Sequence, residues 1–196
     1  RSVAQTPLPQ TFWVNTLKSS SERVCAWLRG DGVSLRPLPW RKDAFELVST
    51  MAPSLGRHWL YLSGLLHIQE AVSMLPVHML AHDTSARVLD MCAAPGNKTA
   101  QLAVKMQNKG CVLANDINYN RLRALGQIAK RLSLVNVSVG HCDAAQFPMI
   151  DNFFDQIIVD VPCSCEGTFR KSQRKVVQPS GANSRRMAQL QLRILQ

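Results

Sequence analysis

The stretch "RVLDMCAAPGNKTAQLAVKMQNKG", residues 87–110, contains the strand, turn and helix from which the fold class can be predicted. A short apolar run, "RVLDM", leads into a turn of small residues and then into a segment with helical spacing that Gly110 closes. Two further runs alternate with a second helix: "CVLAND" (111–116), the helix "NYNRLRALGQIAKRLSL" (118–134) and "NVSVGH" (136–141), after which "DQIIVDV" (155–161) adds a fourth run. This order is typical of a parallel α/β sheet. We therefore predict a Rossmann-like core over residues 86–196.

The residues before this core predict a smaller unit and a connector. "TFWVNTL" (11–17) alternates like a strand, "SSSERVCAWLRGDG" (19–32) carries helix caps, and "VSLRPLPW" (33–40) and "AFELVS" (44–49) indicate two short strands. We assign residues 1–57 to a small α+β N-terminal domain of an RNA-binding kind. Residues 58–85 form the connector, in which the apolar spacing of residues 63–80 predicts a helix broken near Pro76.

The composition indicates a globular protein with a basic surface. The 196 residues are 46% hydrophobic, which is enough to bury a core, and they carry a formal net charge of +10. Residues 170–196 hold seven basic side chains and no acidic one. A solvated surface helix would explain this excess of basic residues. The excess nevertheless favours a surface that contacts a polyanion such as nucleic acid.

The sequence also indicates a cytoplasmic protein. No apolar run approaches the ~18 residues of a membrane span, and the first ten residues lack the layout of a signal peptide. The six cysteines are scattered rather than arranged as a disulfide framework, which fits free thiols in a reducing compartment. The first residue is Arg1, so we expect the chain to begin inside a longer one. The oligomeric state is not predicted.

Carboxylates follow the predicted strands at the edge where parallel sheets bind ligands. The turn "CAAPGNK" (92–98) follows the first run, Asp116 ends the second, Asp143 follows the third and Asp160 lies in the fourth. The turn is neither a dinucleotide fingerprint nor a phosphate loop, but its small residues suit a nucleoside with an amino-acid tail. Asp116 lies 20 residues after Gly96, the spacing of a ribose-binding carboxylate. Single aspartates often cap helices, yet three at successive strand ends predict S-adenosylmethionine as the cofactor.

The cysteines of the stretch "VDVPCSCEGTFRK" (159–171) have three candidate roles: metal binding, nucleophilic attack or simple packing in the core. Cys163 and Cys165 make only a C-x-C pair, so we predict no metal site. Methylation of carbon 5 of a pyrimidine needs a thiolate that adds to carbon 6 and a carboxyl group near N3. Asp160 and Cys163 suit this chemistry. Phosphates of an RNA would be held by nearby cations, and the candidates are Arg170, Lys171 and Arg174.

Five motifs in one order give the chain a family resemblance. "VNTLK", "HIQEAVSMLPV", "VLDMCAAPGNKT", "ANDINYNR" and "DVPCSCEGTFRK" together resemble the RNA (cytosine-5)-methyltransferases of the NOL/NOP/Sun type, especially the bacterial ribosomal-RNA members. The resemblance runs from about Phe12 to Lys171. It implies an enzyme that uses S-adenosylmethionine to form 5-methylcytosine in structured RNA, with ribosomal RNA favoured and tRNA as the other candidate.

The resemblance also implies roles for single residues. Asp116 would bind the ribose, Asp143 the adenine side, and Asp160 both the cofactor and the cytosine, while Arg121 would flank the nucleoside. Cys163 matches a cysteine that helps to release the product. The cofactor loop would consist of Cys92, Ala93, Ala94, Pro95, Gly96, Asn97 and Lys98.

The chain departs from the family pattern at several places. Asn97 replaces the more usual glycine, and Trp13 stands where relatives usually have arginine. The nucleophile of the family lies in a Thr-Cys motif after a fifth strand, and no Thr-Cys pair occurs among the 196 residues. Cys165 is the candidate for a substitute nucleophile, but its position is not built for attack. We therefore expect a core that is incomplete at its C-terminus and inactive as given, and the alternative function is a non-catalytic RNA-binding protein that retains the fold.

Overall fold

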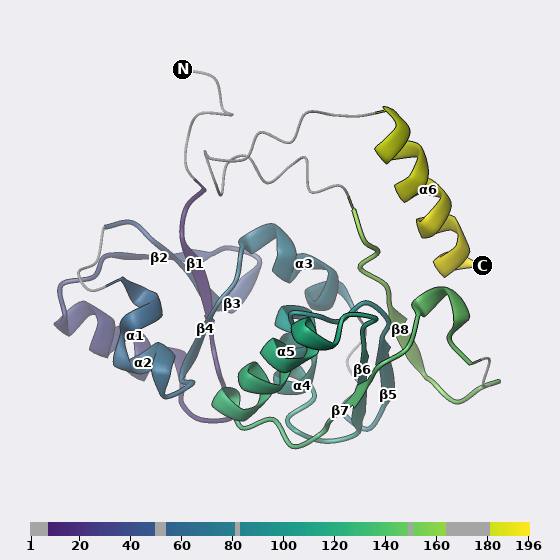
Figure 1. Ribbon diagram of the computed structural model, residues 1–196. Helices are drawn as coiled ribbons and strands as arrows, with labels where there is room; N and C mark the ends of the chain where they lie inside the picture. Colours follow the sequence, from purple (N-terminus) through teal and green to yellow (C-terminus); the bar gives the residue numbers. More distant parts are fainter. Residues whose placement is uncertain (1–7, 50–53, 81–82, 149–150, 164–180) are drawn as a thin grey trace.

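The computed structural model describes residues 8–49, 54–80, 83–148, 151–163 and 181–196, and it contains two four-stranded sheets (Figure 1). The first sheet is antiparallel, with the strand order β2-β3-β1-β4. Its part of the chain comprises β1 (Thr11–Val14), α1 (Ser21–Gly30), β2 (Leu35–Leu38), β3 (Arg41–Leu47), the 3₁₀ turn η2 (Leu55–Arg57), α2 (Trp59–Leu62) and β4 (Leu66–Ile68).

The central strand of this sheet, β1, is covered on both faces. Phe12 and Val14 point into a cluster with Val24 and Leu28 of α1, while Trp13 points into a second cluster on the opposite face. Helix α1 begins where predicted because the Ser20 side chain accepts a hydrogen bond from the Arg23 amide. The predicted strands and helix of the N-terminal unit are therefore present.

The predicted connector helix over residues 63–80 is wrong in its first half. Leu66–Ile68 form β4, in which His67 lies opposite Trp13 of β1, and only Ala71–Met79 form the helix α3. An apolar run of this length has no periodicity that separates a strand from a helix, and its pairing partner lies far away in the sequence. We propose that the N-terminal unit includes β4 and that α3 connects it to the core.

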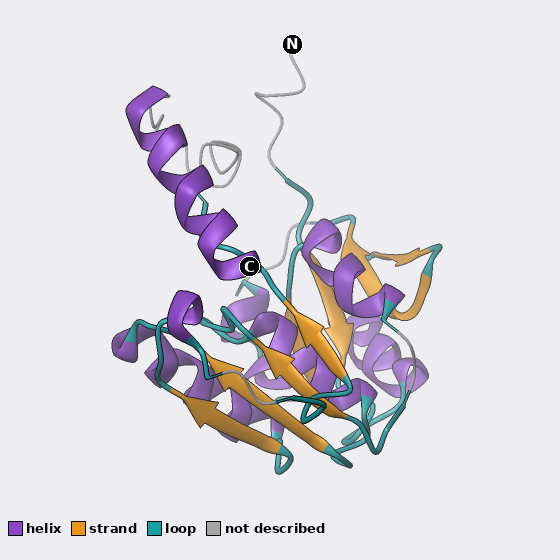
Figure 2. Ribbon diagram, turned by 90° about the vertical axis from the view of Figure 1, so that its right-hand side faces the viewer, coloured by secondary structure: helices purple, strands orange, loops and turns teal. Residues whose placement is uncertain are grey.

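The second sheet is parallel, as predicted, and has the order β7-β6-β5-β8. Figure 2 shows these strands side by side with helices packed against them. The core comprises β5 (Arg87–Asp90), α4 (Asn97–Lys105), β6 (Cys111–Asn115), α5 (Tyr119–Leu132), β7 (Val137–Gly140), the 3₁₀ turn η3 (Ala144–Gln146), β8 (Gln156–Ile158) and α6 (Gly181–Leu195).

The two faces of the parallel sheet differ in burial. On one face, Val88, Val112 and Ile158 pack against Val77 of α3 and Leu102 of α4. On the other face, Ile157 lies beside Leu89 and is 51% exposed. The run 155–161 is apolar on both faces, which is typical of an interior strand. Among the described residues, however, β8 is an end strand that pairs with β5 alone.

The two sheets meet through a shared core. Trp13 is fully buried among Met74 of α3, Val104 of α4 and Leu132 of α5. Its indole Nε1 donates a hydrogen bond of 2.8 Å to Oε1 of Gln69. Trp13, which departs from the arginine of the family pattern, is therefore a packing residue between the sheets.

Polar contacts fix the same interface. The side-chain amide of Asn15 donates to the carbonyl oxygens of Leu132 (2.9 Å) and Gly64 (3.0 Å). Lys18 Nζ donates to the carbonyl oxygens of Arg131 and Ser63, both at 2.9 Å. The last turn of α5 is thus bound to the loop between α2 and β4.

Within the described ranges, none of the helices has the length and apolar character needed to cross a bilayer.

Gly64 tests this interface. It has a φ of +73°, and an added Cβ would overlap the carbonyl oxygen of Arg131. We expect Gly64→Ala to lower the free energy of unfolding by about 2 kcal/mol or more, since a positive φ alone costs about 1–2 kcal/mol in other residues. Urea unfolding measures the change.

The matched control is Gly126→Ala in α5, where an added Cβ meets no atom within 4 Å. We expect this change to raise the free energy of unfolding by about 0.5–1 kcal/mol. If Gly64→Ala also stabilises the protein, the close approach of Gly64 to α5 is wrong.

Candidate active site

The carboxyl ends of all four parallel strands meet at one edge of the second sheet. Asp90 ends β5, Asp116 follows β6, Asp143 follows β7 and Asp160 follows β8. The predicted cofactor residues on β6, β7 and β8 therefore come together at this edge, beside the loop 92–98 that joins β5 to α4.

The loop 92–98 is held by backbone hydrogen bonds. The amide of Ala93 donates to the carbonyl oxygen of Asn115 at 2.7 Å, and the amide of Gly96 donates to the carbonyl oxygen of Ala93 at 2.8 Å. Gly96 has a φ of +108°, and an added Cβ would lie 2.8 Å from Cγ of Leu125. Only glycine fits here, because both the backbone conformation and the contact with α5 exclude a side chain.

Asp116 supports the loop from the neighbouring strand. It is 4% exposed, and its carboxylate accepts hydrogen bonds from the amides of Ala94 (3.1 Å) and Asn118 (2.9 Å). Arg121 lies 3.6 Å from this carboxylate and donates to the carbonyl oxygen of Ala94. Asp116 and Arg121 therefore shape the loop directly, and the predicted contact of Asp116 with a ribose stays a prediction.

A cavity of about 110 Å³ lies between the loop and β8. At its mouth Lys98 Nζ forms an ion pair of 2.6 Å with Asp160, whose side chain is 59% exposed. The cavity is lined by Ser73, Asp90, Cys92, Ala93, Ala94, Pro95, Asn97, Lys98 and Asp160. All predicted loop residues except Gly96 line it, together with Asp160.

Asp90 is a carboxylate of this cavity that the sequence pattern did not reveal. It is fully buried, and its Oδ2 accepts a hydrogen bond of 2.7 Å from the Thr99 hydroxyl, while Oδ1 has no partner. Burial raises the pKa of Asp90 to about 6, and the carboxylates of Asp160 and Asp116 act in the same direction. The sequence signal that could have identified Asp90 is its position. It ends the apolar run "RVLD" (87–90), just as Asp116 ends the next apolar run.

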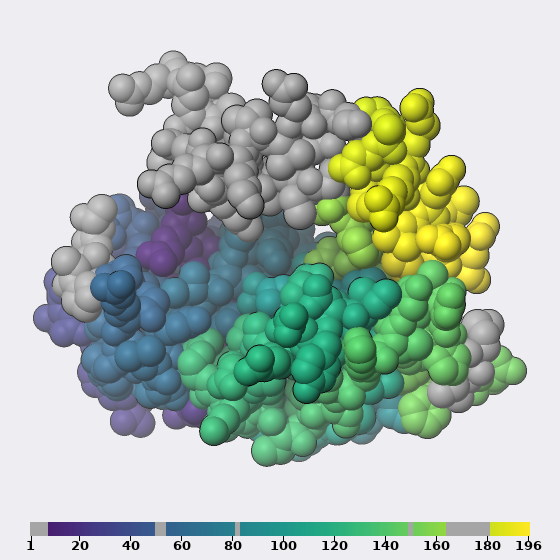
Figure 3. All heavy atoms as spheres, viewed as in Figure 1, coloured from purple at the N-terminus to yellow at the C-terminus, as the bar shows by residue number. Residues whose placement is uncertain are grey.

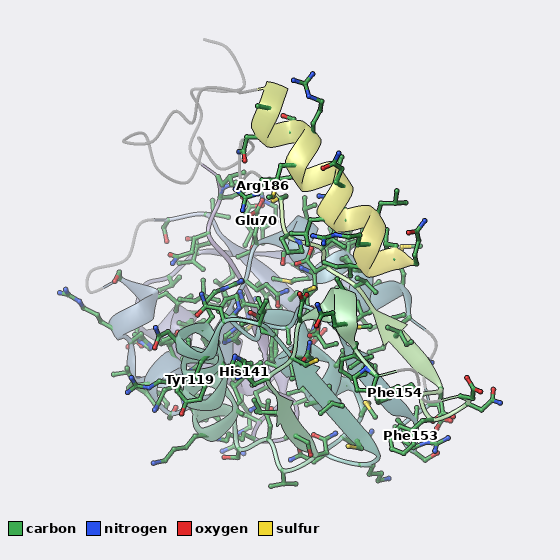
Figure 4. The ribbon with its side chains drawn as sticks, turned by 45° about the vertical axis from the view of Figure 1, so that its right-hand side comes forward. Glu70, Tyr119, His141, Phe153, Phe154 and Arg186 are labelled. Carbon is green, nitrogen blue, oxygen red and sulfur yellow. The ribbon has the colours of Figure 1, made fainter. Side chains whose placement is uncertain are left out.

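Asp143 and two aromatic rings form the outer end of the edge. The Asp143 carboxylate caps η3 by accepting from the amide of Ala145 at 3.0 Å. Tyr119 at the start of α5 and His141 after β7 lie side by side, with ring centroids 5.9 Å apart (Figure 4). The imidazole Nε2 of His141 lies 2.9 Å from the carbonyl oxygen of Ile117. The predicted adenine contact of Asp143 is untested by this geometry.

The cysteines of the site differ in environment. Burial raises the pKa of the Cys92 thiol to about 11, with nearby carboxylates adding to the effect, so Cys92 is a poor nucleophile. Cys163 is exposed and follows Pro162, whose carbonyl oxygen accepts a hydrogen bond of 2.8 Å from Gln191 of α6. Figure 3 shows α6 at one end of the molecule, beside the segment that contains η3.

The remaining predicted residues lie outside the described ranges. They are Cys165, Arg170, Lys171 and Arg174. Within those ranges, no group of three or more histidine, cysteine, aspartate or glutamate side chains could hold a metal ion.

The raised pKa of Asp90 predicts an unusual pH dependence. The folded protein holds this proton up to about pH 6, whereas an unfolded aspartate releases it near pH 4. The free energy of unfolding should therefore fall as the pH rises from about 4 to 6 and stay low above pH 6. We expect Asp90→Asn to remove this fall and to stabilise the free protein by about 2 kcal/mol at pH 7.5.

Urea unfolding at pH 4.5 and 7.5 measures the difference. Asp155→Asn is the control, because Asp155 is exposed at the opposite edge of the sheet and its partner Arg87 lowers its pKa. A pH profile of Asp90→Asn that matches the wild type would contradict the assignment.

Known proteins with similar sequences are ribosomal RNA methyltransferases. Residues 77–196 match the family model described as 16S rRNA methyltransferase RsmB/F. The ribosomal RNA small subunit methyltransferase F of Escherichia coli O1:K1 / APEC is 42% identical over 175 residues, which cover 87% of this chain and 36% of that protein. The protein of the same name from Pectobacterium carotovorum subsp. carotovorum is 39% identical with the same coverage. The chain thus spans about 36% of the length of these relatives.

Two solved structures have the same fold. A methyltransferase homolog protein from Pyrococcus horikoshii is 34% identical, with a TM-score of 0.84, and covers 98% of this chain and 60% of its own. The structure of NSun6 from Pyrococcus horikoshii with SFG has a TM-score of 0.87 at 20% identity, covering 98% of this chain and 72% of its own. The Rossmann-like methyltransferase fold is therefore confirmed, and the chain belongs to the 16S rRNA methyltransferase RsmB/F family.

Proposed function

We propose that this chain is the cofactor-binding part of an S-adenosylmethionine-dependent RNA (cytosine-5)-methyltransferase that acts on ribosomal RNA. The observation that carries the proposal is the cavity beneath the loop 92–98, where a buried carboxylate oxygen of Asp90 has no partner. Membership of the RsmB/F family supports the reaction, and the names of the relatives support a small-subunit ribosomal RNA as the substrate rather than a tRNA.

The residues of the cavity fit the cofactor. An ammonium group next to Asp90 would satisfy the unpaired Oδ1 and favour the charged carboxylate. Ala93 and Ala94 line the cavity and are small enough for a ligand to lie against the backbone. Asp116 and Asp143 stand at the neighbouring strand ends for the nucleoside. When bound, S-adenosylmethionine supplies the methyl group that is transferred.

The residues of β8 and its continuation fit the cytosine side. Lys98 holds the half-exposed carboxylate of Asp160 at the mouth of the cavity, and this carboxylate would accept a hydrogen bond from the 4-amino group at the N3 edge of the base. After a thiolate has added to carbon 6 and carbon 5 has been methylated, Cys163 as thiolate would remove the proton from carbon 5. The freed electron pair then forms the carbon 5–carbon 6 double bond and expels the nucleophilic thiolate.

The charge of the chain fits an RNA substrate. The net charge of +10 favours a polyanion, and we keep Arg170, Lys171 and Arg174 as proposed phosphate contacts. We likewise keep the cytoplasmic location as a proposal.

Cofactor binding is the first test. We expect Asp116→Ala to weaken the binding of S-adenosylmethionine by about 1–3 kcal/mol, because the loop loses the carboxylate that accepts from its backbone. Titration calorimetry on the chain measures the affinity. Asp155→Ala, at the opposite edge of the same sheet, should bind like the wild type. Equal affinity of all three proteins would refute the site.

The role of Cys163 is the second test. In a version of the protein that carries the Thr-Cys motif of the family, we expect Cys163→Ala to transfer the methyl group and remain covalently attached to the RNA. A denaturing gel detects the adduct, and Cys111→Ala is the matched control, since Cys111 begins β6 at the other edge. An inert variant without adduct would make Cys163 the nucleophile. A protein that binds cofactor but never transfers the methyl group would favour the non-catalytic alternative.

A further inference from the structure

A buried histidine connects the N-terminal sheet to the cofactor loop. His67 lies on β4, is 2% exposed, and packs between the rings of Trp13 and Tyr61, with centroid distances of 5.2 and 6.5 Å. No role for this histidine follows from the reaction, because it belongs to the other sheet. Its two ring nitrogens nevertheless both have partners in the core.

The partners define the protonation of the ring. Nη2 of Arg131 lies 2.6 Å from Nδ1 of His67, and Oδ1 of Asn97 lies 2.9 Å from Nε2. A guanidinium can only donate, so Nδ1 must be the acceptor. The proton therefore sits on Nε2 and is donated to the oxygen of Asn97. One neutral tautomer satisfies both contacts.

The surroundings keep this ring neutral. Burial lowers the pKa of His67 to about 4, and the positive charge of Arg131 acts in the same direction, while the hydrogen bond to Asn97 opposes it. The imidazole thus remains a directional donor and acceptor at neutral pH.

Asn97 is the residue through which His67 reaches the cofactor site. It is the first residue of α4, follows Gly96 directly and lines the cavity together with Asp90 and Lys98. A glycine at this position would have no side chain for His67 to contact. The side chain of Asn97 therefore gives this loop an anchor in the other sheet.

We propose that His67 is a positioning residue that fixes the start of α4 through Asn97 and so preorganises the loop 92–98 for S-adenosylmethionine. The inference rests on the proposed function. A loop that is already ordered before binding loses less conformational freedom when the ligand arrives, so the contact should strengthen affinity without touching the cofactor.

A double-mutant cycle tests the proposal, with S-adenosylmethionine as the calorimetric probe. We expect His67→Phe and Asn97→Ala each to weaken binding about 3- to 10-fold, as for a lost hydrogen bond. If His67 acts through Asn97, the double variant should bind no more than about 2-fold more weakly than the single variants. His67→Gln keeps a donor and an acceptor and should restore part of the affinity. It also serves if His67→Phe does not fold.

The control is His58→Gln. His58 is equally buried in the N-terminal unit, where it contacts Asp31 at 3.0 Å, so this change should lower the unfolding temperature and leave the affinity unchanged. Additive losses in the cycle, or a folded His67→Phe variant with wild-type affinity, would overturn the proposal.

A failure of the proposed function is distinguishable from a failure of this inference. If the wild-type chain binds no S-adenosylmethionine, the proposed function is wrong, and the contact is judged from the imidazole nitrogen resonances. An Nε2-protonated His67 whose resonances shift in Asn97→Ala supports the contact. A ring protonated on Nδ1 overturns it.

Discussion

The arrangement of the two sheets depends on one half-buried cation, Arg131, in the last turn of α5. Its guanidinium donates to the carbonyl oxygens of Tyr61 (2.6 Å) and Leu66 (3.2 Å) and lies 4.0 Å from the centre of the Tyr61 ring. Burial lowers the pKa of Arg131, so each neutral partner offsets part of the cost of removing the charge from water. Together with the contacts that Asn15 and Lys18 make to the last turn of α5, these bonds fix the position of α5 against β4 and so of the loop 92–98, which packs on α5 through Gly96.

The carboxylates at the carboxyl edge of the parallel sheet lower the stability of the fold. Burial raises the pKa of Asp90, and the carboxylates of Asp160 and Asp116 add to the effect. Lys98 and Arg121, which pair with these two carboxylates, compensate the negative charges only in part. A fold optimised for stability alone would not bury an aspartate with an unpaired oxygen. A buried carboxylate with an unpaired oxygen is typical of a binding site for a cationic ligand, because the ligand supplies the missing hydrogen-bond donor.

The sequence predicted what depends on local order along the chain. Alternating runs and helices define the parallel sheet, and the spacing from Gly96 to Asp116 brings the carboxylate to the loop. Contacts between distant segments were not readable. The run around Leu66 forms a strand because it pairs with β1, which lies far away in the sequence. The burial of Asp90, with Thr99 as the partner of one carboxylate oxygen, likewise becomes visible only in the folded chain. The run of β8, apolar on both faces, predicts an interior strand, whereas among the described residues β8 lies at the end of the sheet.

The pair of His67 and Asn97 limits what a family resemblance can assign residue by residue. Asparagine in place of glycine reads as a tolerated change when the loop is considered alone. In the folded chain its side-chain oxygen accepts the hydrogen bond that the Nε2–H of the buried His67 donates, so each residue gives the other its partner. Replacing Asn97 with glycine would leave that N–H without its acceptor, at a cost of about 1–3 kcal/mol. Residues at such positions have to be judged in pairs, because the contact and not the single side chain positions the loop.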